Sequence, residues 1–227
     1  MKKNMRIPRN LIRKIGDREP KSKYYIIAEG DRTEFKYFCG IRNNASELKI
    51  DALIEIIPLQ NEDKEKGQSH PIRKIKNFNE TIKNGGIIFD AAIDRVYFVF
   101  DRDPQNFSDS QFDEVKKYVK EQTGYEMCIS NPTFELFLLM HTDEILTLDK
   151  DKMLLNERQG TKRGKRFLEK EVSRIFGCNK SNLNFEKFKT NIRKAIQNEK
   201  YFCEDLEKLK KDLGSNVGVF LDSIISQ

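Results

Sequence analysis

The chain has 227 residues and a formal net charge of +6, with 37% hydrophobic and 34% charged residues. This length suffices for one large domain, or for one domain with an appendage, and the composition allows a buried core. No apolar stretch follows the charged N-terminus, and no run approaches the roughly 18 residues that a membrane span needs. We therefore expect a cytoplasmic protein with neither a signal peptide nor a membrane anchor.

Cysteine and histidine usage excludes two further classes. The four cysteines form no Cys-x-x-Cys pair, and the two histidines lie far from any zinc-binding pattern. A structural zinc site and a disulfide framework are therefore not expected. Reduced cysteines in the cytoplasm are the simplest interpretation.

Charge is unevenly distributed along the chain. Residues 1–23 hold nine Lys/Arg and two acids, residues 24–150 hold 16 Lys/Arg and 23 acids, and residues 151–227 hold 17 Lys/Arg and 11 acids. An acidic centre between basic ends suits a metal-binding site whose flanks hold a polyanion such as nucleic acid. Lysine-rich ends can also be simple solvated faces, so charge alone leaves the choice open.

The first 150 residues alternate between strand-like and helix-like patterns. Residues 1–22 are predicted to be a basic N-terminal arm. Four apolar runs predict strands: 24–29, 50–58, 95–100 and 125–129. Helix-start and helix-stop signals predict four helices: from 33, from 71 to 84, from 108 or 109 to 124, and from 132 to 141. The first and third strands are continuously apolar, which is typical of buried parallel strands.

After residue 150 the pattern becomes helical. Apolar stripes predict helices around 167–176, 185–196 and 206–213, and no long strand is evident. The sequence therefore predicts an α/β fold. A mostly parallel sheet flanked by helices would occupy residues 23–150, and a basic helical subdomain at 151–227 would pack against it as a C-terminal extension.

Two acidic motifs follow the two most apolar strands. Glu29-Gly30 follows the first, and Asp101-Arg102-Asp103 follows the third. Ligands of parallel sheets bind outside the carboxyl ends of the strands, so these carboxylates are expected in one pocket. The two aspartates would lie roughly 6.6 Å apart on extended chain and repel each other by about 2.5 kcal/mol at an effective dielectric near 20.

A divalent cation such as Mg²⁺ or Mn²⁺ would offset that repulsion and support phosphodiester chemistry. Other interpretations need no metal. Asp101 can simply begin a turn, and Glu29 can pair with Arg32 or Arg102.

A third polar cluster, SNPTFE at 130–135, follows the fourth strand and should open on the same edge of the sheet. Glu135 falls in the first turn of its helix, where the dipole favours a carboxylate. It is either a cap or a further carboxylate of the site, and we favour the site. Thr33 can be a helix cap. His141 lies six residues beyond Glu135, off its helical face, and is expected in the core or behind the site rather than on a metal.

Several enzyme classes are excluded by missing motifs. The chain contains no Gly-x-x-x-x-Gly-Lys-Ser/Thr, no Gly-x-Gly-x-x-Gly and no Gly-x-Ser-x-Gly. It is therefore not an obvious nucleotide triphosphatase, dinucleotide enzyme or serine hydrolase.

Three segments in order, IIAEGDRTEFKYF (26–38), VFDRD (99–103) and SNPTFELFLLMH (130–141), resemble the RloB family, with which the abortive-infection protein AbiLii is grouped. Members of that family look like Toprim-fold proteins of bacterial anti-phage loci, often encoded beside an ATPase partner. The resemblance covers roughly residues 24–142.

The resemblance implies roles for the motif residues. The first-strand glutamate of Toprim enzymes acts as general acid/base, which assigns that role to Glu29, and the Asp-x-Asp pair holds Mg²⁺. Asn131 and Glu135 would be additions around the metal. The predicted catalytic residues are Glu29, Asp101, Asp103 and Glu135, the first three also as metal ligands, with Gly30, Thr33, Arg102, Asn131 and His141 in substrate-binding or supporting positions.

These features predict a Mg²⁺- or Mn²⁺-dependent Toprim-like endonuclease that cleaves DNA or RNA in abortive infection, together with an ATPase partner. Self-association is left open. The alternative is a non-catalytic module that binds nucleic acid or the ATPase. A topoisomerase is disfavoured because no tyrosine domain is present, and a receiver-like domain because Glu29-Gly30 stands where adjacent acids would be needed.

Overall fold

The computed structural model describes residues 22–28, 33–58, 71–104, 106–161, 164–179 and 182–225. The predicted arm, apart from its last residue, lies outside these ranges, as do Glu29 and Gly30. Within the described ranges, no helix combines the length and the apolar character needed to cross a membrane.

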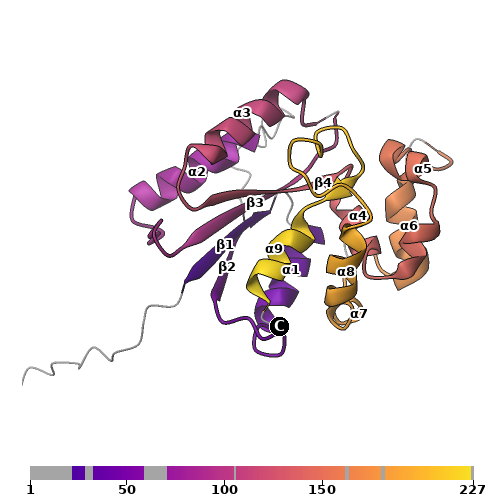
Figure 1. Cartoon of the computed structure of the whole chain (residues 1–227), viewed down its shortest axis with the longest axis horizontal. Helices are drawn as coiled ribbons and strands as arrows, with labels where there is room; N and C mark the ends of the chain where they lie inside the picture. Colours follow the sequence, from indigo (N-terminus) through magenta and orange to yellow (C-terminus); the bar gives the residue numbers. More distant parts are fainter. Residues whose placement is uncertain are drawn as a thin grey trace, which may run out of the picture.

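A five-stranded sheet with the order β2-β1-β3-β4-β5 forms the centre of the described structure (Figure 1). Its strands are β1 (Lys23–Ala28), β2 (Leu53–Pro58), β3 (Arg95–Asp101), β4 (Tyr125–Asn131) and β5 (Gly214–Ser215). The pairs β1–β2, β1–β3 and β3–β4 are parallel, and only β5 is antiparallel to its neighbour. The predicted α/β fold with a mostly parallel sheet is therefore confirmed.

Helices cover both faces of the sheet. On one face lie α2 (Pro71–Lys83) and α3 (Asp109–Lys120), side by side (Figure 1). The other face carries α1 (Thr33–Asn43), α4 (Phe134–Leu139), α8 (Ile192–Glu199) and α9 (Val217–Ile224). Four shorter or outer elements complete this side: η1 (Asp143–Thr147), α5 (Lys150–Leu155), α6 (Phe167–Phe176) and α7 (Glu186–Lys189).

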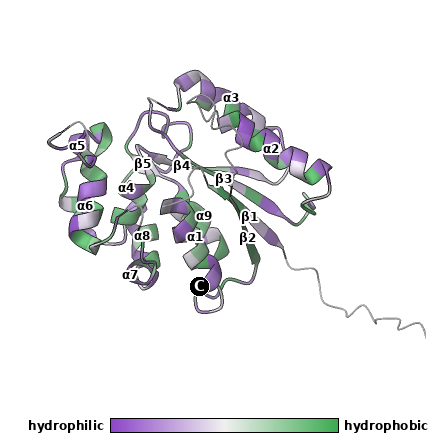
Figure 2. Ribbon diagram, turned by 180° about the vertical axis from the view of Figure 1, so that it is seen from behind, coloured by the Kyte–Doolittle hydropathy of each residue, from purple (hydrophilic) through white to green (hydrophobic). Residues whose placement is uncertain are grey.

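Both faces of the sheet are buried because successive strand residues point to opposite sides. In β1, Ile26 packs in the cluster with α1, whereas Tyr25 and Ile27 pack in the cluster with α2 and α3. This explains why the strand sequences are continuously apolar rather than alternating. The helices are amphipathic, and α2 and α3 alternate between hydrophilic and hydrophobic positions along the ribbon (Figure 2).

Most local signals in the sequence acted as predicted. α1 begins at Thr33, and α2 begins at Pro71. Ser108 caps α3 by accepting a hydrogen bond from Gln111 N–H, and the Gln111 side chain accepts from Ser108 N–H in return. This reciprocal pair satisfies two of the donors that a helix start leaves open.

Two helix predictions in the C-terminal part differ from the structure. The helix expected at 185–196 is divided into α7 and α8. The helix expected at 206–213 is wrong, because these residues form turns. The carboxylate of Asp205 accepts hydrogen bonds from the N–H groups of Glu207 and Lys208, and the Asn131 side chain binds the carbonyl of Leu209. These contacts outweigh the helical spacing of the leucines.

The hydrophobic cluster on the α1 face draws residues from both sides of residue 150. It joins Phe38 and Phe137 to Phe188 and Leu221. The boundary predicted at residue 150 therefore does not separate two hydrophobic cores, and the division into domains stays a prediction.

Tyr37 lies at the centre of this cluster. Its ring is 5.5 Å from that of Phe134 and 5.9 Å from that of Phe137, between centroids. Its hydroxyl lies 3.0 Å from Nε2 of the fully buried His141, whose Nδ1 lies 3.1 Å from the carbonyl oxygen of Leu138. A neutral imidazole that donates through Nδ1 and accepts at Nε2 satisfies both contacts. Burial lowers the pKa of His141 to about 4.

Acid should destabilise the fold through His141. A histidine in the unfolded chain binds a proton near pH 6.5, whereas the buried ring of His141 binds one only near pH 4. The neutral buried ring therefore contributes its full share to the free energy of unfolding above pH 6.5. That contribution is lost as the pH falls towards 4. Between about pH 7 and about pH 4 we expect wild type to lose of the order of 3 kcal/mol more stability than His141→Gln. Urea unfolding of both proteins across this range checks the difference, and parallel curves would contradict it.

The comparison must be made between the two proteins because Glu199 acts in the opposite sense. Its buried carboxyl accepts hydrogen bonds from Gly218 N–H at 2.8 Å and Val219 N–H at 2.9 Å, and burial raises its pKa to about 8. Its contribution to stability is largest below pH 4.5 and is lost as the pH rises through about 8. The His141→Gln variant leaves this trend in place.

Candidate functional site

The parallel register of β3 and β4 brings two polar motifs to one edge of the sheet. Asp101 pairs with Ser130, and Arg102 N–H donates to the Ser130 carbonyl at 2.9 Å. The chain segments that follow these residues leave the sheet at its carboxyl edge, as expected from the sequence. The segments after Asp101 and after Asn131 therefore emerge side by side.

Asp101 is held by the first turn of α4. Its Oδ1 accepts a hydrogen bond from Phe134 N–H at 2.8 Å, whereas the side chain of Thr133, which precedes the helix, makes no capping bond. Asp101 thus caps α4 from the neighbouring strand. The buried side chain of Glu135 belongs to the same turn, where helix N–H groups favour negative charge.

Asp103 lies two residues further on and is buried at 8% exposure. Its Oδ2 lies 3.1 Å from Nη2 of Arg166 and 3.1 Å from Nδ2 of Asn106. Its carbonyl accepts from the N–H groups of Asn106 and Phe107, which closes the turn. An arginine ion pair therefore compensates the charge of this carboxylate.

Arg102 takes no part in this acidic cluster, because its side chain is buried on the other side of the turn. Nε donates to the Lys210 carbonyl at 3.0 Å, and the two terminal nitrogens bind the Phe107 carbonyl and the Asp109 carboxylate. Its guanidinium also lies 5.4 Å from the centre of the Phe112 ring. These contacts make Arg102 a link between α3 and the segment 205–213.

Asn131 makes a second link to the same segment. Its Nδ2 donates to the carbonyl oxygens of Leu209 at 3.1 Å and Asp212 at 2.9 Å. The peptide bond between Asn131 and Pro132, which connects β4 to the start of α4, is cis. The segment 205–213 is therefore fixed beside the edge of the sheet that carries the acidic residues.

A cleft of about 420 Å³ opens at this edge. Asp103, Asp109 and Asn131 line it, as do Arg102 and three further cationic residues, Arg166, Lys210 and Lys211. These three further cations were not among the residues predicted from the sequence. One signal for Arg166 was available: residues 158–166 hold five Lys/Arg and no acid.

The donor set at this edge suits a hard divalent cation. Mg²⁺ prefers carboxylate oxygens and is commonly bound by one or two of them together with waters and substrate phosphates. Asp101 and Asp103 can supply such a pair. The described residues contain no group of three His, Cys, Asp or Glu side chains arranged for a metal. Glu29, the third predicted ligand, lies outside them. Ala28, which precedes it, pairs with Val99, two residues before Asp101.

The remaining predicted residues lie apart from the cleft. Thr33 is buried at the start of α1, and His141 is enclosed in the core against Tyr37. Gly30 lies outside the described residues. Of the predicted residues, Asp103 and Asn131 line the cleft, and the largely buried Arg102 borders it. Asp101 lies at the end of the adjoining strand β3.

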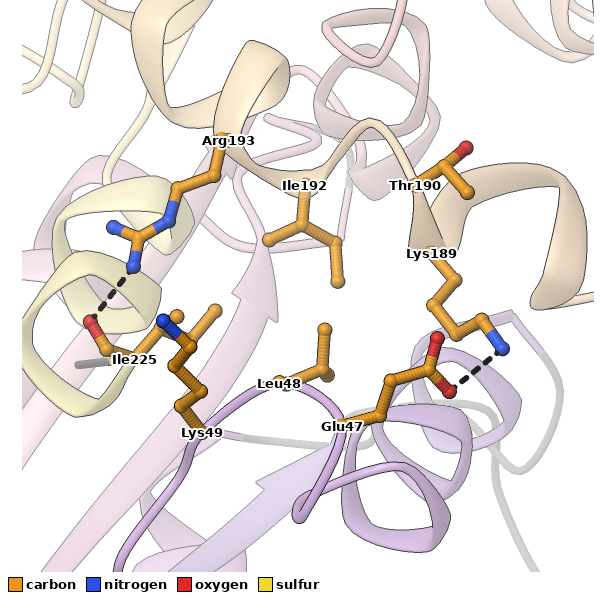
Figure 3. Close-up of a pocket in the computed structure, with 8 residues that line it drawn as sticks. All are labelled: Glu47, Leu48, Lys49, Lys189, Thr190, Ile192, Arg193 and Ile225. Atoms are coloured by element: carbon orange, nitrogen blue, oxygen red, sulfur yellow. Dashed lines mark hydrogen bonds and ion pairs between the residues drawn. The ribbon is translucent and has the colours of Figure 1, made fainter. Parts of the chain in front are cut away.

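A second pocket of about 530 Å³ lies between the segment after α1 and the α7–α8 connection (Figure 3). Leu48 and Ile192 give it an apolar centre, and Lys49 lies at one end. At the other end Glu47 pairs with Lys189 at 3.0 Å. The one carboxylate lining this pocket is thus neutralised by a lysine, and we place the candidate site at the cleft beside Asp103.

The fold and this edge define an α/β protein with an acidic pair and a basic cleft at the carboxyl ends of its parallel strands. A family model described as "RloB-like protein" matches residues 24–224. The chain therefore belongs to the RloB-like family, which is associated with defence and abortive-infection contexts. No curated protein and no solved structure matches the chain.

Replacing Arg102 should loosen the wall of the cleft. Arg102→Met removes the donors that bind the Lys210 and Phe107 carbonyls, and we expect a loss of about 2–4 kcal/mol in the free energy of unfolding. Trypsin should then cut faster in 205–213. Urea unfolding and timed proteolysis measure the two effects.

The matched control is Arg174→Met, which removes an exposed arginine paired with Glu144 and Glu171. Arg174→Met should lower the free energy of unfolding much less than Arg102→Met, because solvent screens ion pairs at the surface. Equal effects of the two substitutions would show that Arg102 is not a structural link.

Proposed function

We propose that the chain is a metal-dependent nuclease with a Toprim-like active site, acting in anti-phage defence. The observation that carries the proposal is the position of Asp101 and Asp103 at the carboxyl edge of the sheet, beside a cleft lined by Arg166, Lys210 and Lys211. Carboxylates that can hold a cation, next to side chains that can neutralise phosphates, are the groups that phosphodiester cleavage requires.

Asp101 and Asp103 would hold the metal, which when bound would polarise a phosphoryl oxygen and activate water. The hydrogen bond from Phe134 N–H fixes the Asp101 carboxylate in advance. Glu29 would act as general acid/base, a role that comes from the resemblance to Toprim enzymes. Preorganised charge of this kind stabilises the charge that develops as the bond breaks.

Arg166 would bind a phosphate of the substrate. Its guanidinium and a metal ion are rival cations for the Asp103 carboxylate. A substrate phosphate offers Arg166 a second anionic partner, with the planar bidentate geometry that arginine prefers. We therefore expect Arg166 to move from Asp103 to a phosphate when nucleic acid binds.

The segment that ends in Arg166 supports a polyanionic substrate. Within the described part of this segment, Arg158 pairs with Arg166 across an antiparallel bridge, and Arg158 Nη1 donates to the Gly164 carbonyl. The sequence of residues 158–166 holds five Lys/Arg and no acid, a composition that suits contact with phosphates.

A second candidate function is that of a non-catalytic module that binds nucleic acid or an ATPase partner. The ion pair between Arg166 and Asp103 favours it, because that pair can hold the acidic turn without a metal. The two candidates differ in whether the chain binds a divalent cation at this edge and cleaves.

Replacing Asp103 should slow cleavage strongly. We expect Asp103→Asn to cut single-stranded and duplex DNA and RNA about 100-fold more slowly than wild type in Mg²⁺ or Mn²⁺. Asp151→Asn, which changes an exposed aspartate of α5, is the matched control and should cut at the wild-type rate. Gel assays should include the product of the neighbouring gene. Wild-type rates for Asp103→Asn, or no cleavage by any form, would contradict the proposal.

Removing Arg166 should separate metal binding from substrate binding. Arg166→Met deletes the cation that competes for Asp103, so Mn²⁺ should bind about fivefold more tightly, which corresponds to about 1 kcal/mol. Nucleic-acid binding should weaken in the same variant. Calorimetry with Mn²⁺ and an oligonucleotide titration give the two readouts. Arg158→Met, which changes the residue bridged to Arg166, is the control for metal affinity, and unchanged Mn²⁺ affinity in Arg166→Met would rule out the competition.

A further inference from the structure

The cleft beside Asp103 has an apolar wall that phosphodiester chemistry alone does not require. Leu154 and Leu155, the last two residues of α5, are 36% and 65% exposed and line the cleft, as do Pro104 and Pro132. Removing a leucine side chain from water is worth about 1.5–3 kcal/mol. Two adjacent exposed leucines at the mouth of a basic cleft therefore favour a ligand that has an apolar part as well as negative charge.

The cations that line the cleft differ in whether a carboxylate already pairs with them. Lys210 is engaged by Asp113 at 2.7 Å, and Arg166 by Asp103. Lys211 is exposed, and among the described residues none pairs with its ammonium group. Lys211 is therefore the cation most available for an incoming phosphate.

The backbone on both sides of Lys211 is fixed. Arg102 binds the carbonyl of Lys210, and Asn131 binds the carbonyls of Leu209 and Asp212. A lysine on a restrained backbone loses less freedom when it binds a phosphate than one on a flexible loop. The segment 205–213 thus presents a charge at a defined place beside the leucines.

We propose that this cleft takes an unpaired nucleotide of single-stranded nucleic acid, with the base against Leu154 and Leu155 and the phosphate on Lys211 and Arg166. The inference rests on the proposed function and narrows its substrate. Proteins that bind single strands combine a positive groove for the backbone with aromatic side chains on which the bases stack. In this cleft Leu154 and Leu155 would supply the apolar surface for the base instead. In a duplex the bases are stacked and paired, so only the cations of this cleft could make contact.

The size of the cleft and its surroundings agree with this occupant. A volume of about 420 Å³ is at the small end of the range for ligand sites and suits one nucleotide rather than a double helix. Arg166 lines the cleft and Arg158 pairs with it across an antiparallel bridge, so a phosphate next to the bound nucleotide would meet a further cation.

Binding without metal tests the inference. Fluorescence anisotropy of the full chain in EDTA is measured with labelled single strands of about 12 nucleotides, as DNA and as RNA, and with duplexes of the same sequences. Wild type should bind one or both single strands at least tenfold more tightly than the duplexes. Leu155→Ser should weaken single-strand binding about tenfold, because the base would lose apolar contact, and leave duplex binding unchanged. Leu146→Ser, at a leucine 43% exposed in η1 and outside the cleft, should change neither.

The lysine is tested in the same assay. Lys211→Ala should weaken binding to single strands and lower the salt dependence by about one phosphate contact. Lys208→Ala, on the same segment but not lining the cleft, should have little effect. Equal affinity for single strands and duplexes, or no effect of Leu155→Ser, overturns the inference, as does an absence of binding to either.

These outcomes are separable from those of the nuclease assay. A chain that binds single strands as described but never cleaves contradicts the nuclease and keeps the binding site. If cleavage depends on Asp103 but Leu155→Ser leaves single-strand binding unchanged, the nucleotide-binding site is contradicted and the nuclease proposal stands. Circular dichroism of each variant confirms that the fold is retained.

Discussion

The parallel pairing of β3 with β4 is the constraint on which the proposed site depends. The register that sets Asp101 opposite Ser130 fixes where both chain segments leave the sheet. Because both faces of these strands are buried in hydrophobic clusters, a slip by one residue would exchange their core positions and is strongly disfavoured. Two motifs 30 residues apart in sequence are thereby held side by side.

Alternation along the chain then divides the roles within the Asp-Arg-Asp motif. The two aspartates contact α4 and Arg166, whereas the intervening Arg102 is buried against α3 and the segment 205–213. A single turn thus supplies the acidic pair and also ties down the opposite wall of the cleft. Asn131 does the same from the next strand. Stability and the proposed chemistry share these residues, and substitutions here must be tested for both.

Most of the strands and helices could be predicted from local sequence patterns. Continuous apolar runs identified the buried strands, and Ser108 and Pro71 marked helix starts because capping and fixed backbone angles act within a few residues. Long-range contacts could not be predicted in this way. The pairing of Arg166 with Asp103 joins residues 63 positions apart, and nothing in their local sequence indicates it. The helix predicted at 206–213 is replaced by turns, because part of the hydrogen bonding there comes from Asn131, which is distant in sequence.

The proposed function requires that the acidic pair at this edge binds a divalent cation. A crystal of the full chain soaked in Mn²⁺, with anomalous diffraction recorded at a wavelength where manganese scatters strongly, tests it most directly. We expect a peak within direct bonding distance of carboxylate oxygens of both Asp101 and Asp103, with Arg166 displaced from Asp103. No peak at this edge, with the Arg166–Asp103 pair intact, would contradict it.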